Sequence, residues 1–429
     1  MKIFFIILIN FFVYSFSYGE DNIRYFVKKA IENNLELDAQ RKNFESAKQD
    51  RNISRSEFLP NITISGNQTS TVSSNQTNQS GSSVADTNLD SENKTISLEQ
   101  TLFSGFKGLN TFKKSELETQ KAKLELKQVE QKTILDTVIA YYDYIYKSKN
   151  EKFNISNLSL FERQFESDSA RLQKGEITLT DLAQSESSLA GANANLIKAK
   201  TELLASKTNF QRVTREKVPN IKNLEEKINL NLPDSLNSSL ELSNTNNLSF
   251  LIAKLNYEIS MKELNIERSR LSPTASIEVS KTESKDFSST IDQTDDEKVK
   301  ATITWPIIKG GENFSSIKKS SYEKQRAKLI LQDTKNKIKS ETFNSWSKFQ
   351  SSKSVLEATR AQLKAAEIAN EGISLEYDSG NTRSTLEVIQ SRSLLLDARI
   401  AFARAQRDFM VSQFELAKQI GSLSVKIIK

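Results

Sequence analysis

The side chains that enzymes use most often for chemistry are missing from this sequence. It has no histidine and no cysteine, so the commonest general base and metal ligand, thiolates and disulfides are all excluded. It also has no Gly-rich phosphate loop and no pattern of paired carboxylates. A hydrolase without His or Cys would need a carboxylate pair in a cleft, and no compact domain that could form one is apparent. We therefore expect a protein that is not an enzyme and that holds no cofactor and no metal ion.

The charged residues are numerous but evenly mixed. Sixty Lys and Arg against 54 Asp and Glu give a net charge of +6. They are interspersed without aromatic residues between them, which is typical of solvated helix faces and not of nucleic-acid binding. Only 12 Gly and 5 Pro in 429 residues, with 37% hydrophobic residues, indicate long and mostly helical elements instead of a compact globule.

The N-terminus resembles a secretion signal. Met1-Lys2 precedes an apolar run from Ile3 to Phe16, and small residues follow before Glu20, so residues 1–19 are predicted to be a signal peptide. After Glu20 no apolar run approaches the eighteen or so residues of a membrane-spanning helix. The chain is therefore expected to leave the cytoplasm, and any contact with a membrane must be made in another way.

The sequence is duplicated. Gly105 and Gly175 correspond to Gly310 and Gly380, so 70 residues separate the two glycines in each half. At about 1.5 Å per residue, a helix of this length is a rod of roughly 100 Å. Another part of the repeat recurs 213 positions later: Asn33-Asn34-Leu35, Arg55-Ser56 and Pro60 return as Asn246-Asn247-Leu248, Arg268-Ser269 and Pro273.

Each half is expected to place a strand hairpin after a helix that ends at a proline. Helical stretches at about 21–57 and 237–271 stop at Pro60 and Pro273. Alternating apolar and polar residues then predict strands at about 60–72 and 94–102, and at about 274–281 and 298–305, with polar loops between them. Such short segments suit membrane β-strands, although each one alone could be an ordinary half-buried strand.

Past each tip glycine the sequence carries a seven-residue repeat. A sustained 3.5-residue period indicates a coiled-coil seam, and small residues between the large ones allow close helix packing. The alternative is the core stripe of an ordinary bundle, but a helix of about 70 residues has no globule large enough to bury it. The positions are Leu182, Leu189, Leu196, Leu203 and Phe210 with Ser185, Ala192, Ala199 and Ser206, and Val388, Leu395, Phe402, Phe409 and Leu416 with Ser391, Ala398, Ala405 and Ser412.

Together these features predict four parts of the chain and an oligomer. The parts are the signal peptide, a first repeat at 20–213 with its tip at 175, an equatorial linker at 214–245, and a second repeat at 246–429 with its tip at 380. Four strands cannot close a barrel, and strands in lipid need closure to avoid exposed edges. Three copies would supply twelve strands, whereas eight strands from two copies leave no passage.

The motif order resembles the TolC family of outer-membrane efflux proteins, over about residues 21–427. The motifs that carry the resemblance are Ser56-Glu57-Phe58-Leu59-Pro60, Leu98-Glu99-Gln100-Thr101-Leu102-Phe103-Ser104-Gly105, Ala140-Tyr141-Tyr142, Thr180-Asp181-Leu182-Ala183-Gln184, Trp305-Pro306-Ile307-Ile308-Lys309-Gly310-Gly311, and Arg383-Ser384-Thr385-Leu386-Glu387-Val388. The resemblance implies a mainly α fold with a membrane β-barrel: a homotrimer whose twelve-stranded barrel in outer-membrane lipid joins a periplasmic α-helical barrel.

The resemblance also implies function and partners. It implies a passive exit duct in the outer membrane with a large periplasmic portion, serving an efflux pump or a type I secretion system. The partners would be a periplasmic adaptor protein and an inner-membrane transporter, driven by ATP or by protons. An alternative is a periplasmic coiled-coil scaffold that never enters a membrane.

The resemblance further implies a gate and a docking site near the two tips. Asp181, Tyr377 and Arg383 match a network that holds the periplasmic end closed, although Asp181 could simply favour a helix start and Arg383 could be a surface charge. Glu387 matches the first of two acidic residues that ring the pore, and the second position is Gln390. The residues that match the adaptor-contacting tips, where glycine also suits a helix C-cap, are Lys174, Gly175, Glu176, Ser379, Gly380 and Asn381.

Overall fold

The computed structural model describes residues 22–219, 228, 230–288, 291–379 and 383–427, so the expected signal peptide lies outside the described residues. The chain forms two compact units, which we call the hairpin unit and the sheet unit. The hairpin unit contains the described parts of 1–35, 130–243 and 341–429, and the sheet unit contains 36–129 and 244–340. No helix of the described residues combines the length and the apolar character needed to cross a membrane.

The helices that precede each strand hairpin are interrupted at the repeated Asn-Asn-Leu motif. The expected single stretches are two helices each: α1 (Ile23–Asn33) and α2 (Leu35–Arg55), then α5 (Leu236–Asn246) and α6 (Leu248–Ser269). Asn34 is extended at φ −82° and ψ 113°. The Asn247 side chain accepts from the backbone N–H of Ser249 at 2.9 Å and caps α6. The duplicated asparagines therefore end one helix and begin the next.

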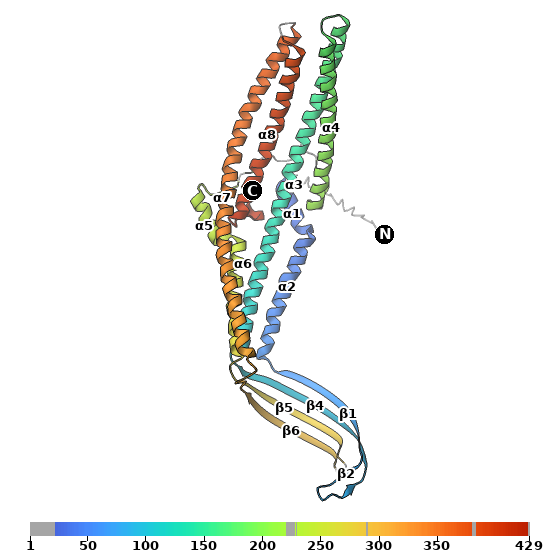
Figure 1. Cartoon of the computed structure of the whole chain (residues 1–429), viewed down its shortest axis with the longest axis vertical. Coiled ribbons are helices and arrows are strands. Elements are labelled where there is room, and N and C mark those ends of the chain that lie inside the picture. Colours follow the sequence, from blue (N-terminus) through green and yellow to red (C-terminus); the bar gives the residue numbers. More distant parts are fainter. Residues whose placement is uncertain (1–21, 220–227, 229, 289–290, 380–382, 428–429) are drawn as a thin grey trace, which may run out of the picture. The chain divides into compact units, whose positions relative to one another are not determined.

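Four antiparallel strands form the main sheet of the sheet unit, in the order β1-β4-β5-β6 (Figure 1). They are β1 (Asn61–Ser73), β4 (Thr87–Ser104), β5 (Thr274–Ser288) and β6 (Ile291–Thr304), and a small hairpin of β2 (Gln76–Thr77) and β3 (Ser83–Val84) lies between the first two. The hairpins of the two repeats meet where β4 pairs with β5, from Ser104 opposite Thr274 to Glu92 opposite Lys285.

The strands are longer than the hydrophobic alternation predicts. The segments 73–93 and 281–297 were expected to be polar loops, but β4 begins at Thr87 and β5 and β6 continue through most of the second segment. The prediction was wrong because it relied on apolar residues. The backbone hydrogen bonds between strands do not need apolar side chains. A strand that is solvated on both faces therefore does not require alternating apolar and polar residues.

The turns that join sheet and helices need glycine at Gly105. Its φ is +61°, and a Cβ at this position would lie 2.8 Å from the carbonyl oxygen of Ser269. Both the left-handed backbone and the close approach exclude other residues. This turn leads from β4 into α3 beside the end of α6.

Two helices of 67 residues each, α3 (Lys107–Gln173) and α7 (Glu312–Asp378), run from the sheet unit into the hairpin unit. In the hairpin unit, α3 turns back into α4 (Leu179–Thr214), and α7 is followed by α8 (Thr385–Gln419) and a short 3₁₀ helix at Val425–Ile427. Most of the predicted heptad positions are buried as expected, in both α4 and α8. The half-buried ones are Leu182, Leu189, Ser206, Phe402 and Phe409. Buried seam members are Ser185, Ala192, Leu196, Ala199, Leu203, Phe210, Val388, Ser391, Leu395, Ala398, Ala405, Ser412 and Leu416.

The core of the hairpin unit is aromatic. Phe26 of α1 lies against Tyr141 of α3 and Phe210 of α4, with ring centroids 6.1 and 5.1 Å apart. Tyr141, Phe210 and Phe414 are fully buried. Such rings bury large areas and fix the packing geometry, so this cluster anchors α1 and both helix pairs at the end remote from the tips.

Candidate functional site at the helix-hairpin ends

The first tip is a glycine C-cap. Gly175 has φ +74°, and its N–H donates to the carbonyl of Leu172 while the N–H of Glu176 donates to that of Arg171, both at 2.9 Å. These are the two hydrogen bonds of a Schellman motif, which requires a left-handed residue at this position. A Cβ on Gly175 would meet no atom within 4 Å, so the surface beside it is open.

Both α4 and α8 begin with a capping box. Thr178 caps α4 with Asp181, whose carboxylate accepts from the Thr178 backbone N–H at 2.9 Å. Ser384 caps α8 with Glu387 through the equivalent bond at 2.8 Å. These backbone hydrogen bonds lower the pKa of both carboxyls, and the Arg383 guanidinium lowers that of Glu387 further. The interpretation of Asp181 as a helix-start acid is thus sufficient to explain its contacts within one chain.

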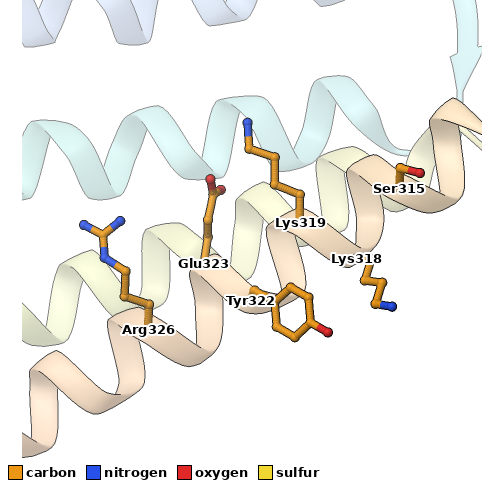
Figure 2. Close-up of a pocket in the computed structure, with 6 residues that line it drawn as sticks. All are labelled: Ser315, Lys318, Lys319, Tyr322, Glu323 and Arg326. Atoms are coloured by element: carbon orange, nitrogen blue, oxygen red, sulfur yellow. The ribbon is translucent and has the colours of Figure 1, made fainter.

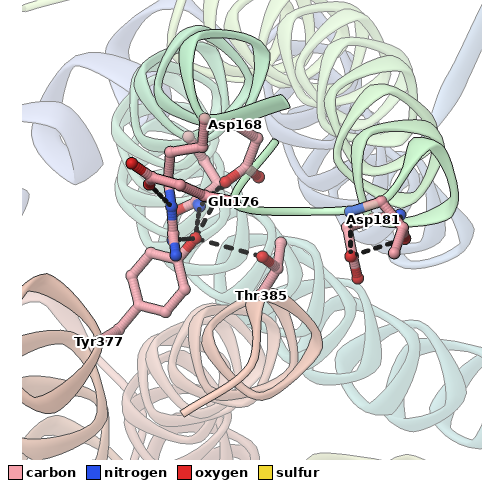
Figure 3. A network of polar contacts seen from close by, with 8 residues as sticks. Asp168, Glu176, Asp181, Tyr377 and Thr385 are labelled. Carbon is pink, nitrogen blue, oxygen red and sulfur yellow. Dashed lines mark hydrogen bonds and ion pairs between the residues drawn. The ribbon is translucent and has the colours of Figure 1, made fainter. Parts of the chain in front are cut away.

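Arg383 is paired on its own helix hairpin. Its Nε lies 2.5 Å from Glu376 and its NH1 lies 2.8 Å from Glu387, and these two carboxylates raise its pKa. Within the described residues of the single chain, no bond joins Arg383 to Asp181. Figure 3 shows Asp181 apart from the polar cluster around Tyr377. A link between Arg383 and Asp181 would therefore have to be made to another copy and in competition with these partners.

The buried centre of the site is Asp168, which the sequence analysis did not identify. This α3 residue is fully buried. Its Oδ1 accepts from Gln164 Nε2 at 3.0 Å and from Tyr377 OH at 2.9 Å, and its Oδ2 accepts from the Ser185 hydroxyl. Three donors hold this carboxylate, as a buried charge requires.

Tyr377 joins the two helix hairpins. Its hydroxyl donates to Asp168, accepts from Arg171 NH1 at 2.5 Å and lies 3.2 Å from the Thr385 hydroxyl (Figure 3). The Arg171 guanidinium also lies over the Tyr377 ring, 4.9 Å from its centroid. Burial raises the pKa of Tyr377, so the hydroxyl keeps its proton and remains a donor. We call Asp168, Arg171, Tyr377 and Thr385 the hairpin lock.

Two further contacts support the hairpin lock. Arg392 of α8 donates to the Gln164 side chain at 3.0 Å and to the Leu160 carbonyl at 3.3 Å, and burial lowers its pKa. Beside it, Phe161 of α3 and Ile389 of α8 are buried in one apolar cluster. Polar and apolar contacts thus join the same two helix pairs.

The other predicted site residues lie on the surface around the lock. Gln390 and Glu387 line a shallow hollow of about 420 Å³ between α7 and α8, with Ala365, Ala369 and Ile373 as its apolar floor. Lys174 and Glu176 are exposed at the first tip, and Glu176 pairs with Arg171 at 3.3 Å. Ser379 is exposed at the end of α7. Gly380 and Asn381 lie outside the described residues.

A signal for the missed residues is present in the sequence. Asn157, Phe161, Gln164 and Asp168 are spaced by four, three and four residues, and all four are buried. This is the spacing of a coiled-coil seam, with polar residues at most of its positions. A search for hydrophobic residues alone passes over it.

In the sheet unit a shallow hollow of about 570 Å³ lies on α7, where Lys318, Tyr322 and Arg326 project from successive turns (Figure 2). Among the described residues, no group of three or more His, Cys, Asp or Glu side chains is placed to hold a metal ion.

Comparison with known proteins identifies relatives over nearly the whole chain. The family model described as outer membrane efflux protein matches residues 26–214 and 240–422. The outer membrane efflux protein BepC of Brucella suis is 24% identical over 406 residues, which cover 92% of this chain and 84% of BepC. The outer membrane protein TolC of Escherichia coli is 22% identical over 311 residues, covering 69% of this chain and 63% of TolC. The CmeC outer membrane channel of Campylobacter jejuni shares the fold, with a TM-score of 0.84 at 16% identity over 94% of this chain and 86% of CmeC.

Proposed function

Because the chain belongs to the outer membrane efflux protein family, we propose that it is the outer-membrane exit duct of a tripartite efflux pump or a type I secretion system. The duct is passive and has no catalytic step of its own. It conducts substrates that an inner-membrane transporter, ABC-type or proton-driven, delivers through a periplasmic adaptor.

The observation that carries this proposal is the four-stranded sheet with two free edges. In the part of the chain that the structure describes, β1 and β6 each have one strand neighbour in the main sheet. One face of this sheet is apolar near the helices and the other is polar, which suits lipid on one side and water on the other. A strand edge cannot remain unpaired in lipid, so β1 of one copy pairs with β6 of the next. Three copies then give a twelve-stranded barrel wide enough for a passage.

The periplasmic scaffold alternative is less well supported. A coiled-coil scaffold has no use for an exposed apolar sheet face, where Ile64 is 80% and Ile303 is 78% exposed. The family match also points to an efflux channel.

The test of this function is assembly together with conduction. In detergent the protein is expected to be a trimer of about 140 kDa, from three chains of 48.5 kDa without their signals. The trimer should insert into planar bilayers and conduct ions. A monomer at micromolar concentration would contradict the proposal that strand edges of neighbouring copies pair. A trimer that never conducts would favour the periplasmic scaffold.

The hairpin ends form the gate in this proposal. The hairpin lock keeps α7–α8 against α3–α4 in each subunit, while Arg383, Glu387, Gln390 and Asp181 lie nearer the surface. Three copies of Glu387 surround the entrance, but each is already paired with Arg383 at 2.8 Å, and Gln390 adds no second acidic ring. The expected cation selectivity and block by multivalent cations are therefore weak.

The tips form the adaptor contact in this proposal. Gly175 is in a left-handed turn with open space beside it, and its sequence neighbours Lys174 and Glu176 are exposed. In the second repeat, Ser379, Gly380 and Asn381 would take the same role.

A further inference from the structure

One face of the main sheet is most apolar in its helix-proximal part. The strand register places Ile62, Leu98, Val279 and Val299 in one row across β1, β4, β5 and β6. All four are partly to largely exposed, at 63%, 37%, 45% and 70%. On this face the neighbouring rows toward the helices contain Ile277 with Ala301 and Ala275 with Ile303.

The apolar face ends abruptly in the next row in the other direction. That row joins Ile64 and Ile96 to Lys281 and Glu297, and Lys281 lies 4.0 Å from Glu297. Beyond it, the next two rows of the same face have no apolar side chain, and Val72, opposite Asn88, is an isolated apolar residue further along β1. The two following rows are Gly66, Lys94, Glu283 and Asp295, and then Gln68, Glu92, Lys285 and Gln293.

The opposite limit of the apolar face is aromatic. Near the helix ends, Phe58 is 50%, Phe103 is 40% and Trp305 is 62% exposed. The Trp305 indole N–H donates to the Leu271 carbonyl at 3.0 Å, so its ring is held in place. Exposed aromatic residues at one end of a lipid-facing band are typical of the membrane interface.

The distance between these limits matches a bilayer, and the strands extend well past it. Eight residues separate Trp305 from Glu297. At about 3.4 Å per residue and a tilt of about 40°, they rise roughly 21 Å, close to the roughly 25 Å apolar band of such barrels. Strand β4 continues from Thr95 to Thr87, nine residues that add roughly 23 Å at the same tilt.

We infer that lipid contact ends at the row of Lys281 and Glu297, and that the distal part of the sheet stands beyond the outer leaflet as a hydrophilic collar. Its charged rows face the lipid headgroups and then water, while its inner face continues the polar lining of the duct. The collar explains why the distal parts of β4, β5 and β6 form strands with few apolar residues, among them Leu89, Phe287 and Ile291. These parts of the strands never enter hydrocarbon. This inference rests on the membrane barrel and not on the gate.

The absence of cysteine from the sequence makes this inference testable by single-cysteine labelling. We choose pairs on one strand and one face: Ile64→Cys with Ser70→Cys on β1, and Val299→Cys with Gln293→Cys on β6. Each trimer is labelled with an environment-sensitive fluorophore and reconstituted into vesicles of brominated phosphatidylcholine. Quenching by bromine is expected at Ile64→Cys and Val299→Cys and is expected to be lost at Ser70→Cys and Gln293→Cys. An inward control, Ser65→Cys, should respond to aqueous iodide instead.

Two results would overturn the collar. Bromine quenching at Ser70→Cys and Gln293→Cys equal to that at the apolar positions would place the whole sheet in lipid. On intact cells, an impermeant maleimide is expected to label Ser70→Cys and not Ile64→Cys. If it labels neither variant, the distal rows do not reach the outside of the cell. If one variant does not form heat-sensitive trimers, the pair on the other strand decides. Conductance of the labelled trimers is measured separately. A protein that shows the expected labelling but does not conduct would contradict the proposed channel function and leave the collar standing.

Discussion

The Tyr377 hydroxyl is the contact by which the proposed gate is best tested, because removing it leaves the ring in place. Tyr377→Phe deletes the donor to Asp168 and the acceptor for Arg171, at 2.9 and 2.5 Å. A hydrogen bond to a charged group contributes about 1.5–3 kcal/mol. Since this bond joins α7 to α3, its loss weakens the closed arrangement of the hairpins by that amount. The ratio of closed to open subunits should fall about 10- to 150-fold.

The assay is single-channel recording in planar bilayers. Trimers with Tyr377→Phe are expected to open more often and to conduct more than the parent, with unchanged trimer stability on heating. The matched control is Tyr322→Phe, the same change on the same helix at a residue 57% exposed, which should leave conductance unaltered. Parental conductance in Tyr377→Phe would refute the hairpin lock as the gate, and an equal rise in both variants would show a general loosening of α7.

Four further predictions concern the tips and the helix starts. Gly175→Val should block export while trimers remain in the membrane, because φ +74° is strained for a β-branched residue. The control Gly191→Val, within α4, should leave export intact. Export is measured by a plate assay of the exported substrate, and the presence of trimers by membrane fractionation. Arg383→Ser should raise conductance less than Tyr377→Phe, since its ion pairs are exposed and screened; the two are compared in the same bilayers. Glu387→Gln should remove most of the weak block by multivalent cations, and a block unchanged on titration with a trivalent cation would exclude Glu387 from the entrance. The carboxyls of Asp181 and Glu387 have pKa values below their ordinary 3.8 and 4.5, so the stability that they give is complete above those ordinary values and is lost as the pH falls through the lowered ones. Hydrogen-exchange protection at the starts of α4 and α8 should therefore decline in acid. Constant protection down to about pH 2 would contradict the capping boxes.

The long helices were predictable because their signals are local. Gly105 and Gly175 mark the ends of α3, and the small residues of the heptads mark the buried face of α4. Glycine position and a seven-residue period both follow from backbone geometry. The sequence therefore predicts where these helices end and which side is buried.

The strands and the lock were harder to predict for two different physical reasons. The distal half of β4 forms through backbone pairing with β1, in which Thr69 lies opposite Ser91, and no side-chain pattern is required. The partner of Tyr377 is Asp168, 209 residues away in sequence. A buried carboxylate between two helix pairs is determined by tertiary packing, and one sequence alone does not show which polar residues meet there.

The pairing of β4 with β5 has a consequence for biogenesis. Ser104 lies opposite Thr274 and Glu92 opposite Lys285, so β4 cannot pair with β5 until the second repeat, through β5, has crossed the inner membrane. Until then the first repeat has only an isolated β-hairpin, which is marginally stable in water. Contacts so distant along the chain form slowly compared with helices. The helical hairpins are thus expected to fold first in the periplasm and to hold the strands together, and insertion into the membrane becomes the last step of assembly.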